Sequence, residues 1–162
     1  MYEAMLWLEG SALAEALRGL GVWTYGIVNL VHILGIGTLF GAVVILDLRL
    51  MGAWSSISVA SIARPTVPLA VCGFFVAICS GISMFSINAT EYHGNPFFYI
   101  KLPTLVAALI NIAVIGRTQA WLRAVNGEAM QAGDRRVLAL AGAVSLLLWL
   151  IVVSCGRMIG YW

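Results

Sequence analysis

Four long apolar stretches, separated by short polar segments, constrain this chain more than any other feature. They cover approximately residues 22–46, 68–87, 97–116 and 137–159. A helix rises ~1.5 Å per residue, so about 20 apolar residues cross the ~30 Å hydrocarbon core of a bilayer. The sequence therefore predicts an all-α membrane protein built as a four-helix transmembrane bundle.

Composition narrows the classes of function. Hydrophobic residues make up 62% of the chain and charged residues 10%, whereas soluble domains average roughly 45–50% and ~25%. We therefore expect residues 1–162 to form a single transmembrane domain, with no separate catalytic domain and no stand-alone enzyme activity. The net charge of +2 is too small to suggest nucleic acid as a partner. The three cysteines lie in apolar stretches without a C-x-x-C pair, which favours small buried side chains.

The residues before the first span form a separate segment. Within residues 2–18, apolar side chains such as Met5, Leu6 and Leu13 share one side of a helix, and Gly19 follows as a helix breaker. This pattern predicts an N-terminal amphipathic interfacial helix that lies on the bilayer, with the docking of a partner as the alternative. Because Glu3 occurs where a signal peptide carries Lys or Arg, we expect no cleavable signal peptide.

Basic residues in the connecting segments predict the orientation. Six arginines fall in the first and third connections, at positions 49, 64, 117, 123, 135 and 136. Cytoplasmic loops carry an excess of Lys and Arg, so we expect these connections to be cytoplasmic. Both termini and the loop at residues 88–95 would then face the periplasm or the exterior.

His32 is the strongest candidate functional residue, because a polar side chain inside lipid is costly. It lies about ten residues into the first span, with Asn29 on the same helix face three residues earlier. One interpretation is a cofactor-binding residue, as a ligand to haem or another metal, or a proton-transfer group. The other is a neutral imidazole hydrogen-bonded to a neighbouring helix.

Lys101, Arg157 and Glu91 form a second candidate group near the outer boundary. Both cations could extend to the interface, or pair with Glu91 as a structural clasp. Alternatively, they could form a basic cofactor-binding pocket for a haem propionate, a quinone carbonyl or a lipid headgroup.

His32 and His93 are the only histidines, so we considered them as the two axial ligands of a b-type haem. Both ligands would have to lie at a similar depth, yet His32 is predicted near mid-membrane and His93 in the outer loop. The sequence therefore argues against a haem held by two histidines.

Small residues recur at helical spacing in two spans. Gly37 and Gly41 are four apart in the first span, and Gly73, Ala77 and Gly81 repeat every four residues in the second. Such spacing lets helix backbones approach closely in lipid. The pattern predicts packing within the bundle or a seam with another subunit.

Three segments, VHILGIGTLFGAVVILDLRLMG, EYHGNPFFYIKLP and LLLWLIVVSCGRMIGYW, together resemble a family of small bacterial membrane proteins known as a domain of unknown function. The likeness covers nearly the whole chain, and its characteristic positions include His32, Asp47, Lys101 and Arg157. It implies a four-helix protein of the bacterial inner membrane and no particular reaction. His93 does not belong to the family pattern.

Three functional hypotheses remain open at this point. The first is an accessory or anchor subunit of a larger membrane complex, which we expect to be a redox assembly with other membrane subunits. The second is an electron-transfer protein that binds haem b or quinone through His32, Lys101 and Arg157. The third is a small channel or transporter formed by a homo-oligomer, with Asn29, His32 and Asn111 along its path.

Overall fold

Helices are the only regular secondary structure in the residues that the computed structural model describes, which are 2–21 and 23–162. Four helices are long and apolar enough to cross a membrane, which confirms the predicted fold class. They are α3 (Trp23–Leu50), α4 (Val59–Ile87), α5 (Pro96–Ile115) and α7 (Ala132–Met158). Val22, the predicted first residue of the first span, lies outside the described residues.

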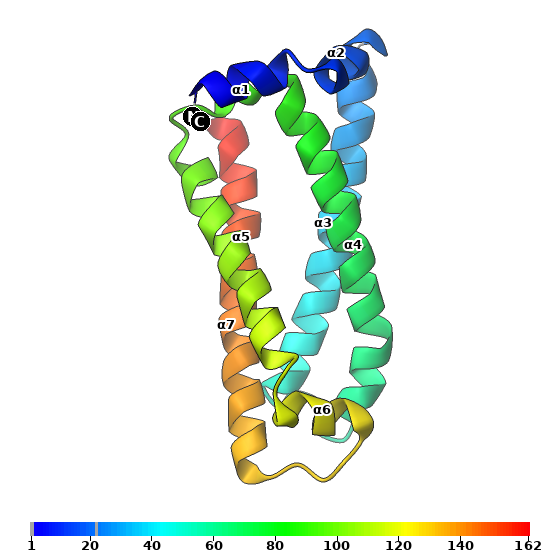
Figure 1. Ribbon diagram of the computed structural model, residues 1–162. Coiled ribbons are helices and arrows are strands. Elements are labelled where there is room, and N and C mark those ends of the chain that lie inside the picture. The colour runs from blue at the N-terminus through cyan, green and yellow to red at the C-terminus, as the bar shows by residue number, and fades with distance from the viewer. Residues whose placement is uncertain (1, 22) are drawn as a thin grey trace.

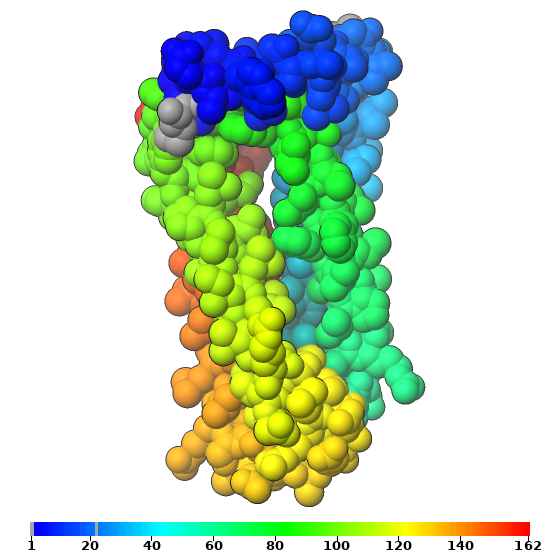
Figure 2. Space-filling view, in the orientation of Figure 1, coloured from blue at the N-terminus to red at the C-terminus, as the bar shows by residue number. Residues whose placement is uncertain are grey.

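The four long helices form two pairs. α3 packs along α4, α5 packs along α7, and the pairs meet through α3 and α7. α4 and α5 are therefore neighbours across an open side of the bundle, and the two chain ends lie at the same end of the molecule (Figure 1). In the space-filling view, an opening separates α4 from α5 beneath the N-terminal segment, and α7 is visible behind it (Figure 2).

Two helices begin earlier in the sequence than the apolar stretches that predicted them. α4 begins at Val59 rather than near residue 68, because the Ser58 hydroxyl accepts from Ser61 N at 3.0 Å and caps the helix. α7 begins at Ala132 rather than near residue 137, where the Asp134 carboxylate accepts from Gln131 N at 3.0 Å. Apolarity marks the part of a helix that contacts lipid, whereas its ends are set by capping groups.

Shorter helices close the two ends of the bundle. α6 (Gln119–Asn126) lies in the third connection, where no helix was predicted, and η1 (Ala89–Tyr92) lies between α4 and α5. A single-turn helix, η2 (Ile159–Tyr161), ends the chain. The N-terminal segment forms two helices, α1 (Tyr2–Glu9) and α2 (Ala12–Gly19), rather than the single helix predicted.

Ser11 explains the break in the N-terminal segment, because its hydroxyl accepts from Ala14 N at 3.3 Å and starts a new helix. α1 and α2 run across the end of the bundle (Figure 1). Met5 and Ala14 are buried beneath them, while Leu6, Trp7 and Leu13 are exposed. The segment therefore covers the bundle with one face and leaves apolar side chains free on the other.

Glycines set the helix pairing. A Cβ atom at Gly73 of α4 would lie 2.5 Å from the backbone nitrogen of Leu39, and one at Gly35 of α3 would lie 2.9 Å from that of Ala77. A Cβ atom at Gly142 of α7 would lie 2.9 Å from the Asp47 carbonyl oxygen. The small residues of α4 thus pack against α3 within this chain.

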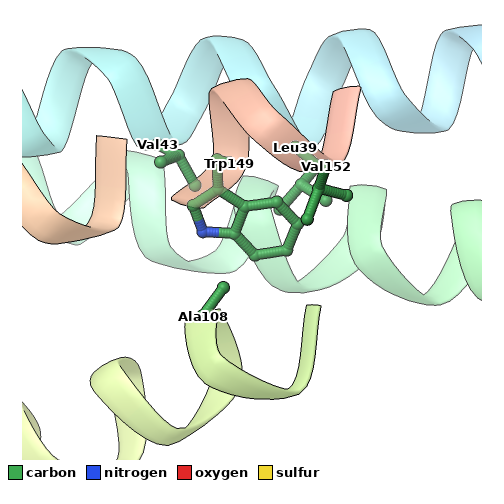
Figure 3. Packing of buried hydrophobic residues seen from close by; sticks show 5 residues of the cluster. All are labelled: Leu39, Val43, Ala108, Trp149 and Val152. Atoms are coloured by element: carbon green, nitrogen blue, oxygen red, sulfur yellow. The ribbon is translucent and has the colours of Figure 1, made fainter. Parts of the chain in front are cut away.

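A hydrophobic core joins the two pairs near mid-length. Trp149 of α7 is 2% exposed. Its indole is surrounded by Leu39 and Val43 of α3, Ala108 of α5 and Val152 of its own helix (Figure 3). This cluster closes the space between the helix pairs below the opening.

Candidate functional site

The space between α4 and α5, in the half of the bundle nearest the N-terminal segment, is bounded at its upper end in Figure 1 by aromatic rings. Phe85 of α4 stacks on Phe98 of α5, with ring centroids 5.2 Å apart and planes 13° apart. Tyr92 of η1 contacts both rings, with centroid separations of 5.2 and 5.5 Å. These rings join the C-terminal end of α4 to the N-terminal end of α5, and the Trp149 cluster forms the lower limit. The helix turns between the aromatic rings and the Trp149 cluster carry His32 on α3, Ser80 on α4 and Lys101 on α5.

His32 crosses from α3 to α4, and a missing side chain makes room for it. A Cβ atom at Gly81 would lie 3.0 Å from Cε1 of the imidazole. Nδ1 of His32 lies 3.0 Å from the Ser80 hydroxyl oxygen. Ser80 itself donates to the Val76 carbonyl, so its only proton is already used. This favours the tautomer in which Nδ1 carries the proton and donates to Ser80.

Lys101 is directed into the bundle rather than toward the interface. Its Nζ lies 3.4 Å from the position of a Cβ atom at Gly156, so the ammonium lies over the α7 backbone where a side chain is missing. The buried Cys155 thiol is close by on the same helix. Within the described chain, Nζ has no carboxylate within 4.0 Å.

The structure places the predicted site residues His32 and Lys101 in the same half of the bundle, each opposite a glycine of a facing helix. An ammonium needs compensation at this depth, because a cation removed from water is costly unless it is paired. This half of the bundle thus combines an unpaired ammonium with an imidazole beneath an aromatic cluster.

Arg157 and Glu91 do not join this region. The exposed Arg157 guanidinium donates to the Tyr161 hydroxyl one turn later and lies 4.6 Å from the centre of that ring. Exposed Glu91 accepts from the Asn88 amide at 3.2 Å. The structure therefore does not bring Glu91 together with Lys101 or Arg157 in an ion pair.

Asn29 is partly buried on α3, one turn above His32. Asn111 lies lower, where its amide donates to the Ala141 carbonyl at 3.2 Å and ties α5 to α7. The hydrophobic cluster around Trp149 lies between these two levels in the described chain.

His93 lies in the loop between η1 and α5, against the ring of Tyr2 at a centroid distance of 5.2 Å. His32 instead lies within the α3–α4 contact. The two histidines therefore do not fit as axial ligands of one haem. Across residues 2–21 and 23–162, no cluster of three or more His, Cys, Asp or Glu could hold a metal ion.

The N-terminal segment is fixed over the site by polar contacts. The Glu9 carboxylate accepts from the backbone N and the hydroxyl of Thr90, at 2.9 and 2.7 Å. Arg18 donates to the carbonyls of Ile87 and Glu9, at 3.1 and 2.7 Å. The bonds from Thr90, backbone first, lower the pKa of the Glu9 carboxyl below its usual value.

Asp47 was not among the candidate site residues predicted from the sequence, although its environment in the structure is unusual. The residue is 4% exposed between α3 and α7, facing the Ser145 hydroxyl. Its Oδ2 has no hydrogen-bond partner in the described structure. The signal was an aspartate directly after the first apolar stretch, where burying a carboxylate is costly.

The chain is a multi-pass helical membrane protein, given its four apolar helices. It belongs to the family of unknown function DUF6644, whose model matches residues 4–162. This confirms the resemblance seen in the sequence. No curated protein and no solved structure matches the chain.

Proposed function

We propose that this protein binds a lipid-soluble ligand of the quinone class between α4 and α5, as a subunit of a redox complex in a bacterial inner membrane. The observation that carries the proposal is the Lys101 ammonium, which is directed into the bundle over Gly156 with no carboxylate within 4.0 Å in the described chain. A lipid-soluble ligand with hydrogen-bond acceptors would take up the N–H donors of this ammonium without bringing a second buried ion.

The donors and acceptors of the site suit a quinone and its reduced form. The carbonyl oxygens of a quinone accept hydrogen bonds, and an ammonium supplies three N–H donors. Nε2 of His32 can accept from a hydroxyl of the quinol form. A hydrogen bond from the charged Lys101 ammonium to a quinone carbonyl would contribute about 1.5–3 kcal/mol.

The surroundings suit the shape of such a ligand. The cluster of Phe85, Tyr92 and Phe98 offers aromatic faces to a planar ring. The opening between α4 and α5 (Figure 2) would let an isoprenoid tail remain in lipid. The arginine-rich connections favour a cytoplasmic inner end, so the site and both termini would be periplasmic.

The proposal is tested by titrating a quinone with a single isoprene unit into the purified protein in mild detergent and measuring its affinity. We expect Lys101→Met to weaken binding about 10- to 100-fold, and Lys101→Arg to restore part of it. Arg157→Gln and His93→Ala are the matched controls and should bind as the wild type does. Equal affinity of wild type and Lys101→Met, with both monodisperse, would refute the site.

A b-type haem is the competing ligand, with His32 as one axial ligand and Lys101 near a propionate. An absorption spectrum of protein from its native host separates the two ligands. A Soret band with reducible α and β bands, lost in His32→Ala, would establish haem and overturn the quinone assignment.

Membership of a larger complex is favoured by a separate observation. Gly37 and Gly41 of α3 are exposed, and a Cβ atom at either position would meet nothing within 4 Å. They form a shallow stripe suited to another transmembrane helix. After gentle extraction, the wild type should migrate with a partner or a second copy, and Gly37→Leu with Gly41→Leu should release it. The exposed Ile33→Leu is the control, and a wild type that runs alone would contradict association.

A further inference from the structure

A basic cavity lies at the opposite end of the bundle from the proposed quinone site. It occupies about 330 Å³ between the end of α3, the α3–α4 connection and the start of α7. This exceeds the ~30 Å³ of one water molecule about tenfold. Arg49, Arg135 and Arg136 contribute to its wall.

The positive charge of this cavity is not neutralised within the described chain. The nearby Asp134 is already engaged, since it pairs with Arg123 at 3.0 Å and accepts from Gln131 N at 3.0 Å. That ion pair is the only one in the described residues. Three arginines therefore line this small space, and none of them pairs with a carboxylate in the described residues.

One of the three arginines is held in place by the fold. Nε of Arg49 donates to the Ile57 carbonyl at 2.6 Å, which leaves its two terminal nitrogens free. Guanidinium groups bind phosphate oxygens through paired N–H donors. A positioned Arg49 beside Arg135 and Arg136 thus suits a phosphate group.

The remaining wall is apolar, formed by residues such as Leu50, Val59, Met130 and Leu138. These side chains belong to the hydrophobic cluster beside α6. The cavity also lies where α3 ends and α7 begins, the depth at which lipid headgroups meet a membrane helix. Charge on one side and apolar surface on the other fit an amphiphile better than a free ion.

We propose that this cavity binds the phosphate headgroup of an anionic phospholipid, with Arg49, Arg135 and Arg136 around the phosphate. The glycerol and upper acyl chains would lie along Leu50, Val59 and Met130. Basic pockets between transmembrane helices commonly hold such headgroups.

Thermal unfolding in mixed micelles tests this proposal, with dioleoyl phosphatidylglycerol as the probe and dioleoyl phosphatidylcholine as its neutral counterpart. Phosphatidylglycerol should raise the unfolding temperature of the wild type in a saturable way. Arg135→Gln with Arg136→Gln should weaken its apparent affinity by about fivefold for each arginine. Arg64→Gln with Arg117→Gln removes two inner-end charges outside this cavity and should leave the affinity unchanged.

Three outcomes would overturn the proposal. They are an equal effect of phosphatidylcholine, an equal loss in the control variant, or equal protection by inorganic phosphate, which would indicate a free-phosphate site. Native mass spectrometry supplies a second readout that does not depend on unfolding. Wild type should retain phosphatidylglycerol, and the Arg135 and Arg136 double variant should lose it.

Discussion

The close approach of α3 and α4 gives the sharpest prediction for stability. In Gly73→Ala, the new Cβ atom would lie 2.5 Å from Leu39 N and 2.8 Å from Gly35 O, and both are backbone atoms. Ordinary contact begins near 3.4 Å, so the helices would have to separate by about 0.9 Å. A gap of that size forfeits a quarter to a half of the attraction between packed atoms.

Gly41→Ala is the matched control, because its Cβ atom would meet nothing within 4 Å. Both variants gain about 0.5–1 kcal/mol from replacing glycine in a helix. Their difference therefore isolates the clash, which we expect to cost Gly73→Ala about 1–3 kcal/mol.

Unfolding by SDS titration from mild detergent measures this difference. The size of each particle should be checked first, since Gly41 faces the proposed subunit seam. Equal unfolding midpoints for Gly73→Ala and Gly41→Ala would refute the close helix crossing.

Three further predictions concern individual polar groups. In Ser80→Ala, loss of the acceptor for His32 Nδ1 should destabilise the protein by about 1 kcal/mol. In the wild type, ¹⁵N NMR should find the His32 ring protonated at Nδ1. Protonation at Nε2 instead would contradict the assigned hydrogen bond. Asp47→Asn should be at least as stable as wild type in thermal unfolding, because an unpaired buried carboxylate is costly; a loss of ~2 kcal/mol or more would mean that the carboxylate has a partner. The folded-state pKa of Glu9 is lowered, so the stability that its carboxylate contributes is complete above the unfolded-state pKa and is lost as pH falls through the folded-state pKa. Hydrogen exchange of α1 should therefore accelerate at acidic pH, and Glu9→Gln should show fast exchange already at pH 7. Unchanged protection of α1 in the variant would exclude this role.

The number of spanning helices could be predicted from the sequence because lipid imposes a length and an apolar character on each. The ends of α4 and α7 could not, since Ser58 and Asp134 start these helices outside the apolar stretches. The break between α1 and α2 depends on a similar cap at Ser11.

The candidate site was predictable in its residue types but not in its geometry. His32 and Lys101 stood out as polar residues in lipid, yet the sequence does not give the rotation of each helix. Gly81 and Gly156 are the residues that would have indicated this geometry, because each leaves room for a polar side chain from the facing helix. Arg157 has no such gap opposite it and pairs with Tyr161 at the surface.

The most direct test of the proposed function is to identify what the protein carries from its own membrane. Protein purified from its native host in mild detergent would be extracted with organic solvent, and quinone would be quantified by mass spectrometry against an unrelated membrane protein. We predict near-stoichiometric quinone with wild type and Arg157→Gln, and a large loss with Lys101→Met. Quinone no higher than in the unrelated protein, or equal amounts in wild type and Lys101→Met, would contradict a quinone site at Lys101.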